Sequence, residues 1–154
     1  MRHLDQTDAR IVLALDDDPL ATTVAVAARL NLARNTVQAR HRRIEADGSL
    51  APTSVRVRPG PLGYPVLAFI TLAISQTRSE DTLAEITAVP EVCEIHAVTG
   101  DADLLVRVVA KDNKDLYRVT GLLLGCSGVV RSNTLISMVE VVPLRMAQLL
   151  RVAQ

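Results

Sequence analysis

Residues 22–47 read TTVAVAARLNLARNTVQARHRRIEAD, and the interpretation of the whole chain starts from this stretch. The pattern predicts two short helices joined by a tight turn. Asn31 can adopt the left-handed conformation that often ends a helix, Leu32 would fill the corner, and the second helix would begin near Arg34. The first helix would pack through a face of small apolar residues: Val24, Ala27, Ala28 and Leu30.

The second helix has an apolar side and a polar side at about 100° per residue. Val37, His41 and Ile44 fall on the side that would face a core. The opposite side presents Asn, Gln and Arg, which can form bidentate hydrogen bonds with base edges. Its residues are the base-contact candidates: Asn35, Gln38, Ala39 and Arg42. The flanking residues are the phosphate-contact candidates: Arg34, Thr36, Arg40 and Arg43. This layout is typical of a recognition helix for double-stranded DNA.

The charges of the chain are segregated, although its formal net charge is +0. Residues 29–58 contain seven Arg against Glu45 and Asp47, whereas residues 4–18 contain five Asp against Arg10. A basic segment that includes the recognition helix favours binding to phosphates. The alternative is a solvated charged helix without a ligand, and the paired helices and turn make that alternative weaker.

The N-terminal residues predict a third helix that completes a small domain. Asp5 would be its N-cap, and Asp8 would lie in the first turn, where a carboxylate favours the positive helix end. The expected buried stripe is Ile11, Val12 and Leu15. We therefore interpret residues 1–50 as a three-helix helix-turn-helix DNA-binding domain.

Residues 51–65 are expected to be a linker that contains a short strand. Within residues 50–58, Val55 and Val57 alternate with Arg56 and Arg58, which predicts a strand with one polar side. The seven residues 59–65 contain three Pro and two Gly, so they can continue neither a helix nor a central strand.

The second half, residues 66–142, repeats a pattern of strand, helix and strand. The predicted strands are 66–74, 92–98, 104–110 and 129–142, and the predicted helices are 79–88 and 114–124. The side chains expected to face the sheet are Leu83 and Ile86 in the first helix, and Leu116, Val119 and Leu123 in the second. The order βαββαβ predicts a ferredoxin-like domain, and hence an α+β chain. Residues 143–154 are expected to form a helical tail.

A sheet of this type has helices on one face only. The first and last predicted strands are apolar on both sides for much of their length. A second subunit packed on the open face would explain this pattern, and a monomer with an exposed apolar face is the alternative. Two recognition helices related by a two-fold axis would read a roughly palindromic site.

Two separated motifs resemble the Lrp/AsnC, or feast/famine, family of transcription regulators. The N-terminal match consists of Leu4-Asp5, Asp8, Ile11, Val26-Ala27, Leu32, Thr36-Val37, Arg40, Glu45 and Gly48, in order and spacing. Residues 98–105 (VTGDADLL) resemble the G-x-x-D signature of the family's regulatory domain, and Gly128-Val129 resembles the pair before its final strand. The chain departs from the family at Ala33, where Ser usually caps the recognition helix, at His41, which is usually aliphatic, and at Ser49, which is usually Val.

The resemblance implies an amino-acid effector bound between subunits. Residues 99–102 alone predict only a hairpin turn. In the family, this hairpin and the last strand of a neighbouring subunit form the effector pocket. The corresponding effector-binding candidates are Thr99, Gly100, Asp101, Ala102, Asp103 and Thr134. Ala102 replaces an aromatic residue found in many relatives. The resemblance also implies a dimer that assembles further, into a tetramer of dimers.

Composition excludes several other classes of function. Aromatic residues make up 2% of the chain, which disfavours a binder of single-stranded nucleic acid. The sequence shows neither a signal peptide nor a membrane span, so we expect a cytoplasmic protein without a membrane partner. Cys93, Cys126 and the three His are isolated, which predicts no metal, no cofactor and no enzyme.

The function predicted from the sequence is a DNA-binding regulator of amino-acid metabolism that responds to an amino acid. A second interpretation is an architectural DNA-binding protein of the same fold that needs no ligand. A third is a sensor of an enzyme partner, with the helix-turn-helix as a protein-interaction unit. Loss of the Gly100–Asp103 pattern would favour the second and loss of the Arg-rich helix the third, and both features are present.

Overall fold

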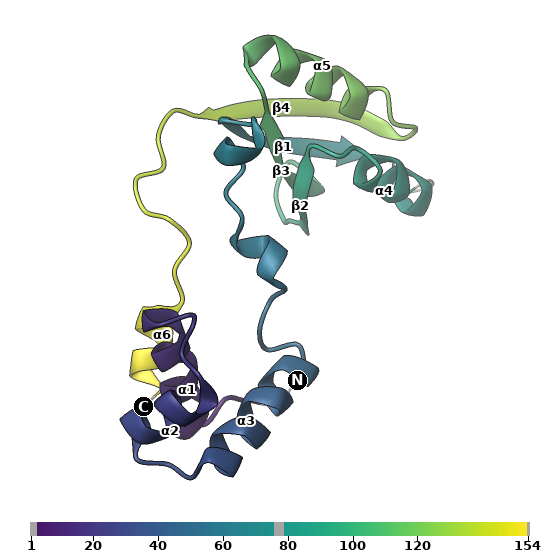
Figure 1. Cartoon of the computed structure of the whole chain (residues 1–154). Coiled ribbons are helices and arrows are strands. Elements are labelled where there is room, and N and C mark those ends of the chain that lie inside the picture. The colour runs from purple at the N-terminus through teal and green to yellow at the C-terminus, as the bar shows by residue number, and fades with distance from the viewer. Residues whose placement is uncertain (1–2, 76–78, 154) are drawn as a thin grey trace. The chain divides into compact units, whose positions relative to one another are not determined.

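The computed structural model describes residues 3–75 and 79–153 (Figure 1). The chain forms two compact units. Unit 1 comprises residues 1–56 and 142–154, and unit 2 comprises residues 57–141. Each unit contains one of the two motifs that resemble the Lrp/AsnC family.

Unit 1 is built on three helices, α1 (Gln6–Asp17), α2 (Thr23–Leu30) and α3 (Arg34–Ala46). The predicted N-cap at Asp5 is confirmed, and with Asp8 it forms a capping box, which satisfies two backbone donors. Asn31 ends α2 in the left-handed conformation, with φ 54° and ψ 50°. The buried core of the three helices consists of Ile11, Ala14, Val26, Ala27 and Val37.

The face of α2 differs from the prediction. Val24 and Ala28 are exposed, whereas Ala27 is buried as predicted and Val26 is buried beside it. Small apolar residues occupy most positions of this helix, so periodicity alone does not determine which side packs against α1 and α3. The turn itself agrees with the prediction, because Leu32 packs against the core.

The predicted linker strand is wrong. Thr53–Arg56 forms a short 3-10 helix, in which the Val55 N–H donates to the carbonyl of Pro52 at 3.0 Å. An isolated extended segment has no ladder partner for its backbone groups. Pro52 fixes φ near the value that a turn requires, which favours the local hydrogen bond.

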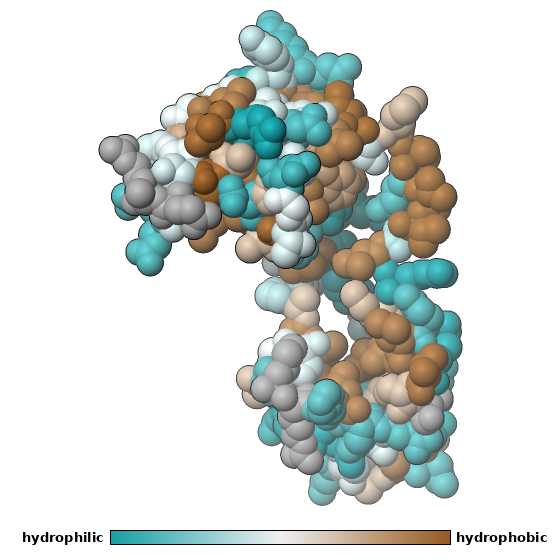
Figure 2. All heavy atoms as spheres, turned by 180° about the vertical axis from the view of Figure 1, so that it is seen from behind, coloured by the Kyte–Doolittle hydropathy of each residue, from teal (hydrophilic) through white to brown (hydrophobic). Residues whose placement is uncertain are grey.

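The tail contains the short helix α6 (Ala147–Val152), within the region where the sequence predicts one. Helix α6 packs on α1 inside unit 1. Residues 138–146, which precede this helix, are mostly apolar and exposed. Figure 2 shows hydrophobic atoms, coloured brown, at the surface. The exposed apolar side chains of this segment are Met138, Val139, Val141, Val142, Leu144 and Met146.

Unit 2 confirms the predicted βαββαβ order. Its elements are β1 (Val66–Ile74), α4 (Ser79–Thr87), β2 (Val92–Ala97), β3 (Leu104–Ala110), α5 (Asn113–Leu124) and β4 (Val129–Ser137). The sheet order is β2-β3-β1-β4, and the adjacent strands are antiparallel. The last strand ends at Ser137 and not at residue 142, because its ladder with β1 ends at the pair Leu67 and Ser137.

Helices α4 and α5 cover one face of this sheet (Figure 1). Ala68, Ile70 and Leu72 of β1 point into the resulting core. They meet the helix side chains Ile86, Leu116, Val119 and Leu123 there. Leu83 was expected to face inward but is 43% exposed, and Thr82 and Ile86 take the buried side of α4.

The other face of the sheet carries the alternate residues of the strands, since side chains alternate along a strand. Phe69 of β1 lies in this set, with Arg107 of β3 and Leu135 of β4 as its cross-strand neighbours. Phe69 is 36% exposed and Leu135 is 51% exposed. The open face predicted from the sequence is therefore present.

Candidate nucleic-acid interface and effector pocket

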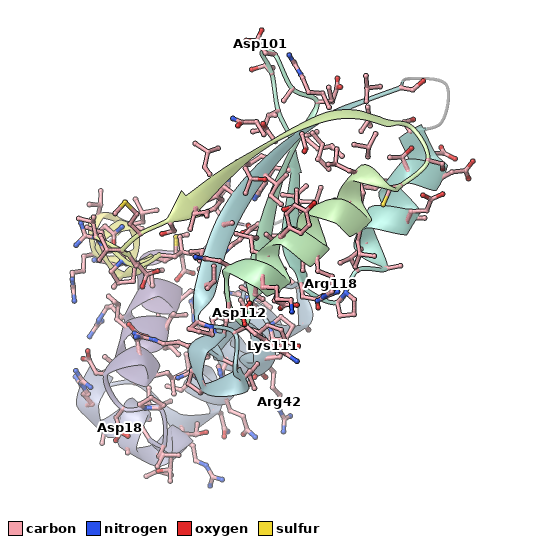
Figure 3. The ribbon with its side chains drawn as sticks, turned by 90° about the horizontal axis from the view of Figure 1, so that it is seen from above. Asp18, Arg42, Asp101, Lys111, Asp112 and Arg118 are labelled. Atoms are coloured by element: carbon pink, nitrogen blue, oxygen red, sulfur yellow. The ribbon has the colours of Figure 1, made fainter. Side chains whose placement is uncertain are left out.

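Helix α3 presents most of the base-contact candidates on one exposed side. Asn35, Ala39 and Arg42 are exposed, and Gln38 is half-buried. Val37 and Ile44 occupy the opposite side and are buried in unit 1. Figure 3 shows the Arg42 side chain extending away from the ribbon. The polar side predicted for this helix is therefore a real surface of the unit.

Arg34 and Thr36, two of the phosphate-contact candidates, lie exposed in the first turn of this helix. Within residues 3–75 and 79–153, no carboxylate pairs with Arg34 or with Arg42. The positive end of the helix dipole adds to the attraction for phosphate there. Ala33 stands at the N-cap without a side-chain hydrogen bond, as its sequence predicts.

Arg40 and Arg43, the other two arginines proposed to contact phosphate, point toward α1. The Arg40 Nη1 lies 2.6 Å from Asp5 Oδ2 and 2.8 Å from Asp8 Oδ1. The Arg43 Nη2 lies 2.5 Å from Asp8 Oδ2. These two guanidiniums are thus engaged with carboxylates of the same unit.

Asp8 is the residue that sequence reasoning missed. It was expected only to favour the helix dipole, yet just 1% of it is exposed, and its two oxygens serve both arginines. The contacts span 32 and 35 residues along the chain, so no local pattern reveals them. The feature of the sequence that could have indicated these contacts is the acidic segment, residues 4–18, whose charge complements that of the basic segment, residues 29–58.

The ion pairs reduce the free positive charge of the basic segment. The Arg40 guanidinium, by its hydrogen bond, lowers the pKa of Asp5 from 3.8 to about 2. Arg29 pairs with Asp17 at 2.5 Å. Three of the seven arginines are therefore neutralised by neighbouring carboxylates. The four without a carboxylate partner among the described residues are Arg34, Arg42, Arg56 and Arg58.

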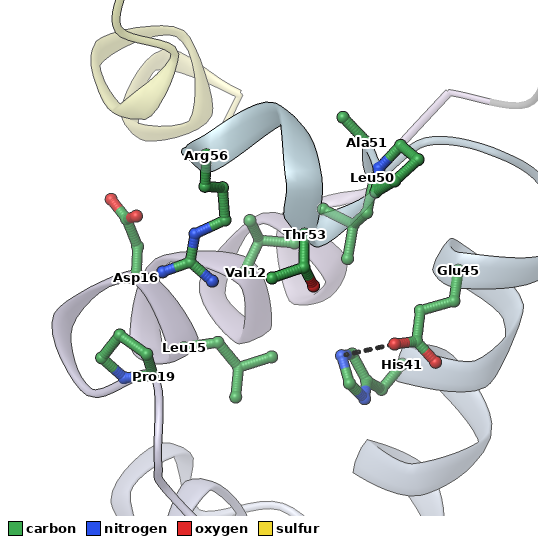
Figure 4. Close-up of a pocket in the computed structure, with 11 residues that line it drawn as sticks. Val12, Leu15, Asp16, Pro19, His41, Glu45, Leu50, Ala51, Thr53 and Arg56 are labelled. Atoms are coloured by element: carbon green, nitrogen blue, oxygen red, sulfur yellow. Dashed lines mark ion pairs between the residues drawn. The ribbon is translucent and has the colours of Figure 1, made fainter. Parts of the chain in front are cut away.

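A groove of about 560 Å³ lies between α1, α3 and the 3-10 helix of unit 1 (Figure 4). Val12 and Leu15 form an apolar wall, which explains why these two predicted core residues are only half-buried. His41 was expected in the core stripe, but it lines this groove, with Nε2 3.7 Å from Glu45 Oε1. The polar ring is therefore accommodated at the edge of the core.

The hairpin between β2 and β3 contains most of the effector candidates. Gly100 has φ 110°, a conformation that side-chain-bearing residues rarely adopt. The Val98 N–H donates to the Asp103 carbonyl at 3.0 Å, which closes the loop. Figure 3 shows Asp101 at the tip of this hairpin.

Asp103 ties the hairpin to the end of β1. Its Oδ2 accepts the Ile74 N–H at 2.8 Å, and its own N–H donates to the Leu72 carbonyl at 2.9 Å. Ile74 lies beyond the last pair of the β1–β3 ladder, Leu72 with Leu104, so its backbone donor needs such a partner. This contact favours the hairpin-stabilising role over contact with an effector.

Asp101 and Ala102 line a pocket of about 300 Å³ on unit 2. The remaining lining residues are Thr71, Ala73, Arg131, Ser132 and Asn133. The Arg131 Nη2 donates to the Asp101 carbonyl at 2.8 Å, so the guanidinium lies beside the hairpin. The pocket thus has an anionic side chain, a cationic side chain and small walls.

The pocket does not gather all of the predicted effector residues. Thr99, Gly100, Asp103 and Thr134 do not line it. Thr134 pairs with Ile70, whose side chain points into the helix-covered core. The Thr134 side chain therefore lies on the helix-covered face of the sheet, on the opposite side from the pocket. Arg131 and Asn133 were missed because the β1–β4 register cannot be read from the sequence, and only this register places them beside Thr71 and Ala73.

The two cysteines carry no sign of activated chemistry. Cys93 is exposed and Cys126 is half-buried, and partial desolvation raises the pKa of both thiols, which favours their protonated, unreactive form. Within the described ranges, no group of three or more His, Cys, Asp or Glu side chains could hold a metal ion. No helix in the described part of the chain is long and apolar enough to cross a membrane.

Both units match family models. Residues 4–45 match the AsnC-type helix-turn-helix domain, and residues 67–146 match the Lrp/AsnC ligand binding domain. The chain is 27% identical to the HTH-type transcriptional regulator FL11 of Pyrococcus horikoshii over 133 residues, which are 86% of this chain and 88% of that protein. It is 29% identical to the transcriptional regulator AldR of Mycolicibacterium smegmatis over 120 residues, which are 76% of this chain and 70% of that one.

Solved structures resemble this chain over most of its length. A transcriptional regulator from Neisseria meningitidis in complex with L-methionine has a TM-score of 0.81 at 25% identity, over 96% of this chain and 99% of that chain. AsnC of E. coli has a TM-score of 0.85 at 21% identity, over 95% and 99%, which shows the common fold. With the family models matching more than half of its residues, the chain belongs to the Lrp/AsnC family of transcriptional regulators.

Proposed function

We propose that this regulator binds specific sites in duplex DNA and that a bound amino acid changes its DNA affinity or its assembly. The observation that supports DNA binding most directly is the exposed polar side of α3. Arg42 lies on this side with Asn35, and Arg34 lies in the first turn; neither arginine pairs with a carboxylate of the described ranges. Such side chains suit base edges and phosphates in the major groove. We place this activity in the cytoplasm and among the genes of amino-acid metabolism.

The effector pocket that we propose is the groove on unit 2 beside Asp101. A zwitterionic amino acid needs an anion for its ammonium group and donors for its carboxylate. The Asp101 carboxylate has no partner among the described residues, and Arg131 and Asn133, which line the same pocket, could supply the donors. A solved relative from Neisseria meningitidis was obtained as a complex with L-methionine, which supports an amino acid as the ligand class.

We also propose that the open face of the sheet is covered by a second copy of the chain. The cross-strand neighbours Phe69 and Leu135 are large, apolar and partly exposed there. A ligand changes an equilibrium only through its different affinity for two states. An effector that alters how copies pack would therefore alter the spacing of two recognition helices on DNA.

The test is a thermal-shift screen of the full chain against the twenty amino acids. A ligand at 100 times its dissociation constant should stabilise the folded state by about 2.7 kcal/mol. Arg131→Gln and Asp101→Asn should each lose this shift while melting normally without ligand, and Glu140→Gln, on the exposed segment after β4, is the matched control. If no amino acid shifts the melting temperature, the effector is rejected, and the ligand-independent architectural form of the function is favoured.

A further inference from the structure

The carboxylate of Asp8 connects α1 to two arginines of the recognition helix. Arg40 and Arg43 are one turn apart on α3, and each donates to a different oxygen of Asp8, at 2.8 Å and 2.5 Å. Asp8 Oδ2 also accepts the Asp5 N–H at 3.2 Å, as part of the capping box. A single buried carboxylate therefore joins the start of α1 to two points on α3.

Burial makes this connection hard to break. Asp8 is 1% exposed, whereas 51% of the Arg29 side chain and 55% of the Asp17 side chain are exposed in the ion pair that joins α2 to α1. A buried carboxylate that loses its cations remains uncompensated, which is strongly unfavourable. Only 26% of the Arg40 side chain and 34% of the Arg43 side chain are exposed. Neither guanidinium is free to move to a phosphate while Asp8 holds it.

We propose that Asp8 is a positioning residue for DNA recognition, which fixes the orientation of α3 and withholds Arg40 and Arg43 from the DNA backbone. This inference rests on the proposed DNA binding. Two attachment points three residues apart fix both the rotation of the helix about its axis and its tilt against α1. The side that carries Asn35, Gln38 and Arg42 is thereby held outward.

The role has a signature that a purely structural residue lacks. Each arginine that pairs with a phosphate releases counterions, and the slope of log affinity against log salt changes by about 0.9 for each such contact on duplex DNA. In Asp8→Asn the neutral amide no longer neutralises Arg43, which becomes available to phosphate, whereas Arg40 keeps its pair with Asp5 at 2.6 Å. The slope should then steepen by about 0.9 for each recognition helix. The ratio of specific to random-sequence affinity should fall about tenfold, since α3 is no longer held in one orientation.

The experiment is fluorescence anisotropy of the full-length protein on a selected operator and on a random duplex, at several salt concentrations. Asp8→Asn should give a steeper slope and a smaller ratio. Asp17→Asn, which removes the exposed ion pair with Arg29 on α2, should keep the ratio of the wild type. Loss of affinity on both duplexes with an unchanged slope would overturn the positioning role and leave Asp8 a residue of general stability.

A second pair of variants covers the case in which Asp8→Asn does not fold. Arg40→Gln retains the pair between Asp8 and Arg43, and should leave the slope within about 0.3 of the wild type, whereas Arg34→Gln, at an exposed phosphate-contact candidate, should flatten it by about 0.9. Equal flattening by both variants would overturn the inference. Wild-type protein that binds no duplex in a salt-dependent manner would instead reject the proposed function itself.

Discussion

At the residue scale, Asp101 and Asp103 stand two positions apart in one hairpin but have different surroundings. The Asp103 carboxylate accepts the Ile74 N–H at 2.8 Å, whereas Asp101 lines the pocket and accepts from Arg131 through its backbone carbonyl. The family resemblance implied both Asp101 and Asp103 as effector-binding candidates. The contact with the Ile74 N–H distinguishes the two aspartates. Because the Asp103 carboxylate already accepts this N–H, it stabilises the hairpin whether or not a ligand is present.

The first prediction concerns Asp103→Ala. Removal of the acceptor leaves the Ile74 N–H without its partner, which should lower the free energy of unfolding of unit 2 by about 1 to 3 kcal/mol. The loss should be the same with and without effector, as measured by chemical denaturation. Asp101→Ala is the matched control, with an unchanged stability in the absence of ligand. A selective loss of effector binding in Asp103→Ala, with stability retained, would contradict this assignment.

The second prediction concerns the pH dependence of the Asp5 ion pair. The pKa of Asp5 is lowered to about 2 by the Arg40 guanidinium, so its contribution to stability is present above pH 3.8 and is lost as the pH falls toward 2. Half of the Asp5 side chain is exposed, so solvent limits the contribution to below about 1 kcal/mol.

The variant Asp5→Asn isolates this effect, since Asn is an equally good N-cap but carries no charge. Urea titrations should show the variant less stable than the wild type at pH 5 to 7, with the difference vanishing near pH 2. Asp16→Asn, in the same helix, controls for removal of one exposed carboxylate. A difference that stays constant down to pH 2 would show that the charge of Asp5 does not contribute.

At the element scale, helix α3 lacks a side-chain cap at its N-terminus. Ala33 has φ −67° and ψ 140°, the extended conformation that an N-cap requires, but no side-chain oxygen. As a third prediction, Ala33→Ser should stabilise unit 1 by about 0.5 to 2 kcal/mol, because its hydroxyl would accept a free N–H of the first turn. Denaturation monitored by circular dichroism gives the value. Ala39→Ser, in the middle of the same helix, should give no gain, and a gain of similar size there would show that the cap is not the cause.

The helices, strands and contacts of this chain were predictable from the sequence to different degrees. Strands β1 and β3 match their predicted bounds, since long apolar runs between turn signals identify them. The prediction of a strand in the linker was wrong, because an alternation of apolar and polar residues does not supply a neighbouring strand to pair with. The polar side of α3 was predictable from its periodicity, but the contacts of Asp8 and the pocket residues Arg131 and Asn133 were not, because they depend on pairings between distant parts of the chain.

At the scale of the whole molecule, the chain passes between its two units twice. It leaves unit 1 after residue 56, forms unit 2, and returns to unit 1 at residue 142. Unit 1 contains helix α3, and unit 2 contains the pocket beside Asp101 and the open sheet face. In the proposed function, DNA and the effector are thus bound by different units of one chain, which supplies the two distinct sites that allosteric coupling requires.

The fourth prediction tests the open face. Leu135→Glu places a charge beside Phe69 in the middle of this face, and burial of an unpaired charge is strongly unfavourable. We expect wild-type protein to have the mass of two or more chains in size-exclusion chromatography with light scattering, and Leu135→Glu the mass of one. Leu83→Glu, on the exposed side of α4, is the control and should keep the wild-type mass. A single-chain mass for the wild type would mean that the open face is not an interface.

The most direct test of DNA binding through α3 is the salt dependence of duplex binding. Fluorescence anisotropy would compare the wild type with the double variant Arg34→Ala/Arg42→Ala, which removes the two arginines of this helix that have no carboxylate partner among the described residues. For the wild type, the logarithm of the association constant should fall linearly with the logarithm of the salt concentration. The double variant should bind more weakly, and its slope should be flatter by about 0.9 for each phosphate that it no longer neutralises. Equal affinities and equal slopes for the two proteins, or no salt-dependent binding by the wild type, would contradict the assignment of α3 as the DNA-binding helix.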